Sequence, residues 1–303
     1  MAANVLTLIA APGADGMVEP AVDAAIDALG RLGAGIAGCT WLAPALACDV
    51  AFEDLDPDQA DAAARAALGE GFGAIDLVAQ PAEGRRKRLL VADMESTIIV
   101  NEMLDELADL LGLRARVAEI TRRAMNDEID FAAALRERVS LLGGMPQSAL
   151  DEAGARIQVM PGARELVATM RANGAYAVLV SGGFGVYTGR IRAALGFDLD
   201  VANELVVEGG TLAGRVREPI LGRDAKLASL KRIAAERALP LAAALAVGDG
   251  ANDVAMIEAA GLGIAFHPKP AVAARVRNRI DHGDLTALLY AQGYRAEEIV
   301  RPA

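Results

Sequence analysis

The chain has 303 residues, of which 53% are hydrophobic and 23% are charged. This length and balance suit about two globular domains with a large buried core, and they exclude a largely disordered protein. The formal net charge of −11 argues against a nucleic-acid or anionic-membrane partner, because both require clustered positive surface, so we expect neither.

Residues 1–80 predict a small α+β domain. Its pattern predicts strands over 4–10, 34–42, 46–52 and 75–78 and helices over 19–32 and 57–68. The order strand, helix, strand, strand, helix, strand is that of a ferredoxin-like fold. No ligand signature stands out, so the domain is either a packing or homodimerisation module or a binding module for a regulatory amino acid.

Residues 81–88 predict a linker, because Pro81, Gly84 and four basic residues interrupt the apolar pattern there. The basic cluster, residues 85–88, stands immediately before a buried strand. We therefore interpret it as a solvated linker and not as a nucleic-acid-binding patch.

The sequence favours a soluble protein in the reducing cytoplasm. Cys39 and Cys48 are its two cysteines, and they lack the spacing partners of a metal site or a disulfide framework. The first residues lack the basic segment of a secretory signal. Glycines break the longest uncharged runs, which are shorter than the roughly 20 apolar residues of a membrane-spanning helix.

Three apolar runs after the linker end in polar residues and predict neighbouring strands of a parallel sheet. The runs 89–92, 176–180 and 243–247 end, respectively, in Asp93-Met94-Glu95-Ser96-Thr97, Ser181-Gly182-Gly183 and Gly248-Asp249-Gly250-Ala251-Asn252-Asp253. Ligands of doubly wound sheets bind at the carboxyl ends of the strands, so we expect these side chains to share one crevice. The alternative for the first run is that Asp93 or Ser96 only caps the helix that follows.

Helical patterns fill the segments between these strands, which predicts a doubly wound parallel α/β sheet from residue 89 onward. A helix over 98–112 and helical segments over 117–143 predict a cap, about residues 100–158, inserted after the first strand. Further expected elements are helices over 163–172, 223–237 and 255–260 and a β-hairpin of 202–207 with 211–216.

Four stretches in this order, Asp93–Thr97, Ser181–Phe184, Lys226 and Gly248–Asp253, resemble the phosphoserine phosphatase family of the haloacid dehalogenase superfamily. The resemblance covers roughly residues 85–290. It implies a haloacid dehalogenase-like phosphatase domain over 89–303, an ACT-like amino-terminal domain, and hydrolysis of O-phospho-L-serine as the last step of serine biosynthesis. One departure is Glu95, where the family usually has aspartate.

The resemblance implies catalytic roles. Asp93 would be the nucleophile that forms an aspartyl-phosphate, and Glu95 would be the general acid and base. A phosphate dianion repels these acids, so a cation is needed. Mg²⁺ prefers hard oxygen ligands, and those implied here are Asp93, the main-chain carbonyl of Glu95 and Asp249, with Asp253 either a further ligand or a residue that orients the waters of the ion.

The resemblance also implies substrate contacts. The phosphoryl group would meet Ser181, the Gly182 N–H, Lys226 and Asn252. The amino acid part would meet Glu102 with its ammonium group, Arg138 with its carboxylate, and Met125 and Phe131 with its apolar side.

The residues are compatible with three functions. The first is phosphoserine hydrolysis, and the second is hydrolysis of another small phosphomonoester. The third is an amino-acid sensor with weakened catalysis, because the extra methylene of Glu95 moves the carboxyl by roughly 1.5 Å and such misplacement can cost about a hundredfold in rate.

Overall fold

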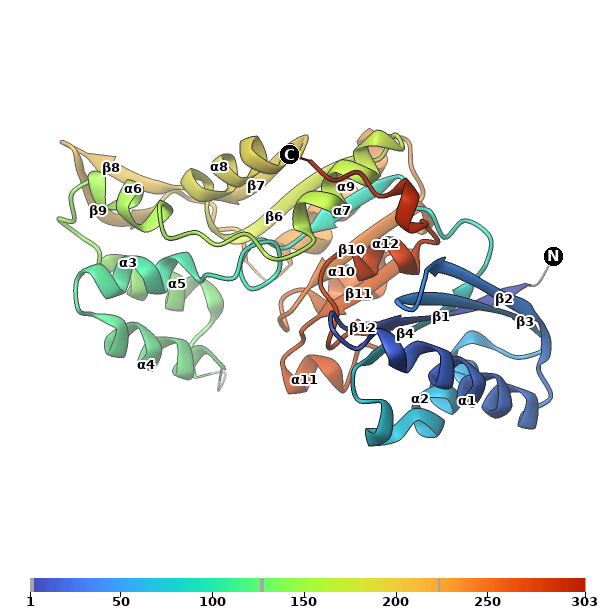
Figure 1. Cartoon of the computed structure of the whole chain (residues 1–303). Coiled ribbons are helices and arrows are strands. Elements are labelled where there is room, and N and C mark those ends of the chain that lie inside the picture. Colours follow the sequence, from blue (N-terminus) through green and yellow to red (C-terminus); the bar gives the residue numbers. More distant parts are fainter. Residues whose placement is uncertain (1–2, 126–127, 223, 303) are drawn as a thin grey trace.

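The structure is a computed structural model that describes residues 3–125, 128–222 and 224–302 (Figure 1). Within these ranges the strands form sheets of four, six and two strands. The six-stranded sheet is parallel, and the four-stranded sheet near the amino terminus is antiparallel. This confirms the predicted α/β class with an added α+β unit. No helix in the described ranges is both long and apolar enough to cross a membrane.

The amino-terminal unit has the strand order β2-β3-β1-β4, which is that of a ferredoxin-like sheet. Its elements are β1 (Asn4–Ala10), α1 (Val18–Arg31), β2 (Gly35–Ala43), β3 (Ala47–Glu53), α2 (Pro57–Leu68) and β4 (Ile75–Pro81). Leu6 and Leu8 of β1 belong to the core formed with α1 and α2, whereas Ile9 belongs to the core of the larger unit. The sheet is therefore covered on both faces, by its own helices and by the rest of the chain.

The large sheet has the order β12-β11-β10-β5-β6-β7. Its strands are β5 (Leu89–Ala92), β6 (Tyr176–Phe184), β7 (Leu199–Asn203), β10 (Ala244–Gly248), β11 (Leu262–Phe266) and β12 (Arg279–Ile280). The helices packed around it are α7 (Ala163–Ala172), α8 (Gly185–Leu195), α9 (Ala225–Glu236), α10 (Val254–Ala259), α11 (Pro270–Ala273) and α12 (Ala287–Ala291). β5 and β10 are buried throughout, as expected for central parallel strands.

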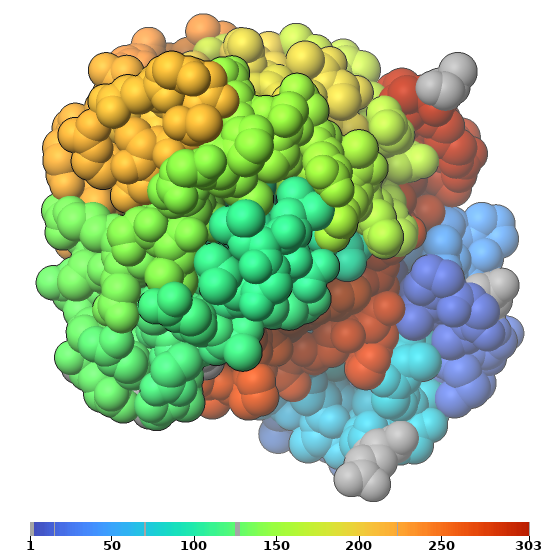
Figure 2. Space-filling view, turned by 90° about the vertical axis from the view of Figure 1, so that its left-hand side faces the viewer, coloured from blue at the N-terminus to red at the C-terminus, as the bar shows by residue number. Residues whose placement is uncertain are grey.

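A separate group of helices projects beyond the end of this sheet. It consists of α3 (Met103–Leu110), α4 (Arg114–Met125), α5 (Phe131–Ser140) and α6 (Ser148–Gly154), with the hairpin of β8 (Leu205–Glu208) and β9 (Thr211–Val216) beside them. Two linkers join α3–α6 to the sheet, and they pair through Val100 N–H to Gln158 O and Met160 N–H to Ile98 O, both at 2.9 Å. Figure 2 looks onto this group, shown in green, with the blue amino-terminal residues lying away from it.

Two predicted element boundaries were wrong. The helix expected over 98–112 begins at Met103, because the residues before it form the paired linker and Ile99 makes bridges to Glu95 and Val159. The strand expected over 202–207 is two strands, β7 in the large sheet and β8 in the hairpin. The hairpin turn is made by Gly209 and Gly210, both with positive φ (57° and 80°), which suits a two-residue turn.

The basic cluster is a solvated linker only in part, because Arg86 and Arg88 are exposed whereas Lys87 is buried. Lys87 is buried, and its Nζ donates to the carbonyl oxygens of Gly84 at 2.9 Å and Ala242 at 3.0 Å. Arg85 donates to Asp49 of β3 at 2.6 Å. Arg85 thus joins the linker to the amino-terminal unit, and Lys87 joins it to the larger unit.

Asp76 of β4 adds a contact between the units. Its carboxylate accepts hydrogen bonds from the main-chain N–H groups of Asp281 and Gly283, both at 2.7 Å. Gln80, also in β4, donates to Ala291 O at 2.6 Å. The amino-terminal sheet is thus held against residues 281–291 by polar contacts as well as by packing.

Candidate active site

Three carboxylates gather where β5 and β10 end. Asp93 follows β5, Asp249 follows β10, and Asp253 stands just before α10. Ala92 pairs with Val247 in the sheet, so the residues after the two strands emerge side by side. One oxygen from each carboxylate lies within 4.8 Å of the others, and all three side chains are buried.

Lys226, on the first turn of α9, lies among these carboxylates. Its Nζ is 2.8 Å from Asp93 Oδ1 and 2.5 Å from Asp253 Oδ1. Burial alone would lower the pKa of Lys226, but the charges of Asp93 and Asp253 outweigh it and raise this pKa. Burial and the charge of Asp253 in turn raise the pKa of Asp93 well above its usual range. One lysine therefore does not relieve the repulsion within the group.

This donor set fits a hard divalent cation. Such ions bind carboxylate oxygens, and a charge of two added to that of Lys226 would balance three carboxylates. A second acidic group, Asp76 with Asp281 and His282, does not fit a cation. Both oxygens of Asp76 already face main-chain N–H groups, whose positive ends repel a metal ion.

Asp93 presents one oxygen for chemistry. Its Oδ1 accepts the N–H of Met94 at 2.8 Å and is also the oxygen beside Lys226. Its Oδ2 accepts no hydrogen bond from any residue within the described ranges. The carboxylate is therefore oriented through one oxygen while the other is left for a nucleophilic attack.

Ser181 and Gly182 lie at the end of β6, next to β5 in the sheet. The buried Ser181 Oγ accepts the N–H of Gly183 at 2.9 Å. Asn203 supports this loop, since its Nδ2 donates to Gly182 O at 2.9 Å and its Oδ1 accepts the N–H of Leu221 at 2.7 Å. Sequence reasoning missed Asn203; its one signal was a polar residue at the end of a strand.

Glu95 reaches from the core toward α3. Its Oε1 accepts the N–H of Met103 at 2.8 Å, and its Oε2 lies so close to Gly183 that a Cβ there would be 2.7 Å from it. Burial and the charge of Glu102 raise the pKa of Glu95 to about 8, although the Met103 N–H opposes the shift. A carboxyl with this pKa is protonated at neutral pH and can donate a proton.

The residues expected to bind an amino acid line the facing helices. Glu102 accepts a hydrogen bond from the hydroxyl of Ser96 at 2.8 Å. The Phe131 ring lies close to Gly182, since a Cβ added to that glycine would be 3.1 Å from Phe131 Cζ. Burial lowers the pKa of Arg138, while the charges of Glu95, Asp105 and Glu102 oppose the shift. The structure thus brings the charges of Glu95, Glu102 and Arg138 near one another, and it places Phe131 beside Gly182. The side chain of Met125 lies outside the described part of the chain.

Asn252 and Lys269 lie near this group. Lys226 hydrogen-bonds Asp253, and the Oδ1 of Asn252 lies beside Gly250. Lys269 was not predicted; its Nζ lies 3.0 Å from Asp249 Oδ2. A lysine shortly after a strand of the same sheet was the available signal, but no pattern linked it to Asp249.

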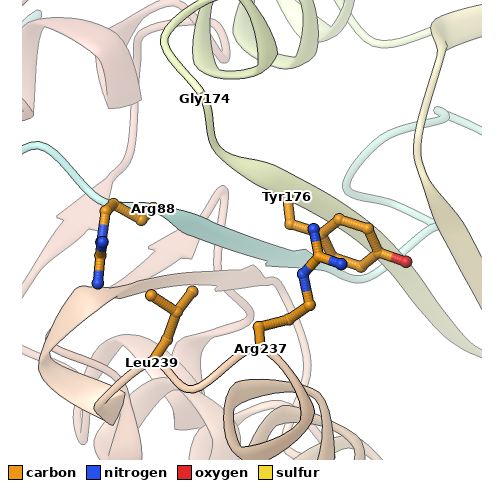
Figure 3. A pocket seen from close by; sticks show the side chains of 5 residues that line it. All are labelled: Arg88, Gly174, Tyr176, Arg237 and Leu239. Carbon is orange, nitrogen blue, oxygen red and sulfur yellow. The ribbon is translucent and has the colours of Figure 1, made fainter.

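A small pocket of about 150 Å³ lies at the opposite ends of the strands and is lined by Arg88, Gly174, Tyr176, Arg237 and Leu239. Figure 3 shows the Arg237 guanidinium over the Tyr176 ring, 3.9 Å from its centre, while Arg88 does not point toward this pair. The guanidinium groups of Arg88 and Arg237 do not point toward one another, so this pocket does not form a second charged site comparable to the carboxylate group.

Known proteins are similar to this chain in sequence and fold. Residues 90–258 match the family model of haloacid dehalogenase-like hydrolases. The phosphoserine phosphatase of Streptomyces coelicolor is 40% identical over 225 residues, which cover 74% of this chain and 55% of that one. A phospho-aspartyl intermediate analogue of phosphoserine phosphatase superposes with a TM-score of 0.63 at 38% identity, covering 67% of this chain and 98% of the other.

The likeness extends to the amino-terminal unit. The unliganded crystal structure of a probable phosphoserine phosphatase from Vibrio cholerae covers 98% of this chain and 88% of its own, with a TM-score of 0.76 and 27% identity. The chain spans about half the length of the first curated relatives that it matches.

Proposed function

The chain belongs to the haloacid dehalogenase-like hydrolase family, and we propose on that basis that it hydrolyses O-phospho-L-serine to L-serine and phosphate. The observation that carries the proposal is the position of Asp93: one oxygen is held by Lys226 and Met94, and the carboxylates of Asp249 and Asp253 lie beside it. A serine-biosynthetic role in the cytoplasm fits the two unpaired cysteines.

In the first step, Asp93 Oδ2 attacks phosphorus as the ester bond to the serine oxygen breaks. Glu95 gives its proton to the departing oxygen, so serine leaves neutral at that atom and an aspartyl-phosphate remains. Lys226 holds the other oxygen of Asp93 and offsets negative charge on the transferring group. In the second step, Glu95 takes a proton from water, whose oxygen attacks phosphorus and releases phosphate and the Asp93 carboxylate.

We propose Mg²⁺ as the resident ion, held by Asp93, Asp249, Asp253 and the main-chain carbonyl of Glu95. When bound, it supplies the positive charge that lets a phosphate dianion approach these carboxylates. The support is the close spacing and burial of the three acids.

We propose that the phosphoryl oxygens bind Ser181, the Gly182 N–H and Lys226, with Asn252 nearby. The substrate ammonium group would pair with Glu102 and its carboxylate with Arg138, since a guanidinium matches a carboxylate in two parallel hydrogen bonds. Phe131 and Met125 would cover the apolar side. The position of Phe131 over Gly182 supports this arrangement.

The test is release of phosphate from O-phospho-L-serine with Mg²⁺, measured for the wild type and for Asp93→Asn. We expect the variant to lose turnover and to form no phosphoenzyme. Equal turnover by the two proteins, or calorimetric binding of phosphoserine with no turnover by either, would refute the proposal.

Substrate choice is tested with phosphothreonine, phosphohomoserine and a sugar phosphate. Arg138→Ala should raise KM for the amino-acid esters and leave the sugar phosphate unaffected. A uniform loss over all substrates would place Arg138 outside amino-acid recognition.

A further inference from the structure

Two lysines contact the three-carboxylate group formed by Asp93, Asp249 and Asp253, and they differ in how they are held. The side chain of Lys226 is 4% exposed and contacts two of the carboxylates. The side chain of Lys269 is 56% exposed and contacts only Asp249, at 3.0 Å. Lys226 is enclosed, whereas Lys269 reaches the same group from the solvent side.

The main chain of Lys269 is fixed close to Asp249. Its N–H donates to Asp249 O at 3.3 Å, and its carbonyl oxygen accepts the N–H groups of Val272 at 2.8 Å and Ala273 at 3.0 Å. Pro270 follows and begins α11. The ammonium group can therefore leave Asp249 by rotation about side-chain bonds while the backbone stays in place.

Two cations compete for the Asp249 carboxylate, the divalent ion and the ammonium group of Lys269. A divalent cation at the three-carboxylate group needs an oxygen of Asp249, and an ammonium group at hydrogen-bond distance from that carboxylate would lie within a few ångströms of the ion. Two cations so close repel each other. Of the two lysines, only Lys269 is exposed enough to move away.

We propose that Lys269 is a displaceable counter-ion of the metal site. Its ammonium group neutralises Asp249 while the site holds no metal, and it releases this carboxylate when a divalent cation binds. The inference rests on the proposed function only in requiring a divalent cation at Asp93, Asp249 and Asp253. The affinity of the site is then set by competition between the ion and the chain's own lysine.

Removing the competitor should tighten metal binding. We expect Lys269→Gln to lower the dissociation constant for Mg²⁺ by about tenfold, the effect of losing one favourable charged contact in the metal-free state. Lys269→Arg keeps the charge and should stay near the wild type. Lys231→Gln removes an exposed charge from α9 and serves as the matched control.

The measurement is calorimetric titration of Mg²⁺ into each full-length variant without substrate. Tighter binding by Lys269→Gln alone supports the proposal. Unchanged or weaker binding by this variant, or equal tightening by Lys231→Gln, overturns it.

A second measurement needs no variant. The rate of acetylation of Lys269 in the wild type, read by peptide mass spectrometry with Lys231 as internal reference, should rise severalfold when Mg²⁺ saturates the protein. A rate that stays constant or falls contradicts displacement.

Failure of this inference is distinguishable from failure of the proposed function. If the wild type does not bind Mg²⁺, or if Asp253→Asn binds it as well as the wild type does, the proposed metal site is wrong. If it binds such an ion and Lys269 neither competes with it nor becomes more reactive, only the displacement is wrong.

Discussion

The carboxylate of Glu95 accepts a hydrogen bond from the main-chain N–H of Met103, at 2.8 Å. Met103 is the first residue of α3, so an acid from the central sheet contacts the group of helices that faces it. The extra methylene of Glu95, compared with aspartate, provides the reach for this contact. The glutamate at position 95, where the family usually has aspartate, thus has a hydrogen-bond partner at the distance its longer side chain reaches.

Shortening this side chain should impair catalysis. In Glu95→Asp the carboxyl would retreat by roughly 1.5 Å, lose the Met103 N–H and stand away from the leaving group, so we expect kcat to fall about a hundredfold. Steady-state kinetics with phosphoserine checks this. A kcat equal to or higher than that of the wild type would contradict the prediction that catalysis depends on the longer side chain of Glu95.

The raised pKa of Glu95 should make the stability of the metal-free protein depend on pH. Its pKa of about 8 lies above the ordinary value of 4.5, so between these values the folded state binds more protons than the unfolded state. The free energy of unfolding should therefore fall as pH rises from about 4.5 to 8. Urea unfolding in EDTA at pH 5 and pH 8 measures the change.

Glu95→Gln is the comparison for that measurement, because it removes this titration and leaves the other groups. The fall in stability between the two pH values should be smaller in the variant. An identical fall in both proteins would assign the dependence to other groups.

A side chain at Gly183 should displace the Glu95 carboxyl. A Cβ there would lie 2.7 Å from Glu95 Oε2, so Gly183→Ala should push the carboxyl aside and lower kcat at least tenfold. Gly189→Ala, in α8, has no atom within 4 Å of the added carbon and is the matched control. Equal kcat in the two variants would contradict the prediction.

Asp76 should stabilise the contact between the two units. Asp76→Ala leaves the N–H groups of Asp281 and Gly283 without their acceptor, at an expected cost of about 1–3 kcal/mol in the free energy of unfolding. Urea unfolding followed by circular dichroism measures this cost. Asp27→Ala, an exposed acid on α1, should change the free energy by less than about 0.5 kcal/mol.

The sequence predicted the parts of the site that depend on local pattern. β5 and β10 are short, wholly apolar runs, and the acids that follow them were placed at one sheet edge by the rule for parallel strands. The two units and most helices followed from periodicity in the same way. The parts of the candidate site that could be predicted are therefore those in which a strand and its polar residues are adjacent in the chain.

Contacts between distant segments were beyond such patterns. Asn203 meets Gly182 and Lys269 meets Asp249 because of the order of strands in the sheet and the course of the loops between them. The burial of Lys87 and the pairing of Arg85 with Asp49 likewise depend on how two units pack, which local charge does not reveal.

The contact of β4 with residues 281–291 also has a consequence for synthesis of this chain on the ribosome. A ribosome releases the amino-terminal sheet some two hundred residues before the segment that supplies the N–H partners of Asp76 and the carbonyl partner of Gln80. Until that segment emerges, one face of the sheet lacks its cover, and a nascent chain interrupted before residue 281 would expose it to chaperones and proteases.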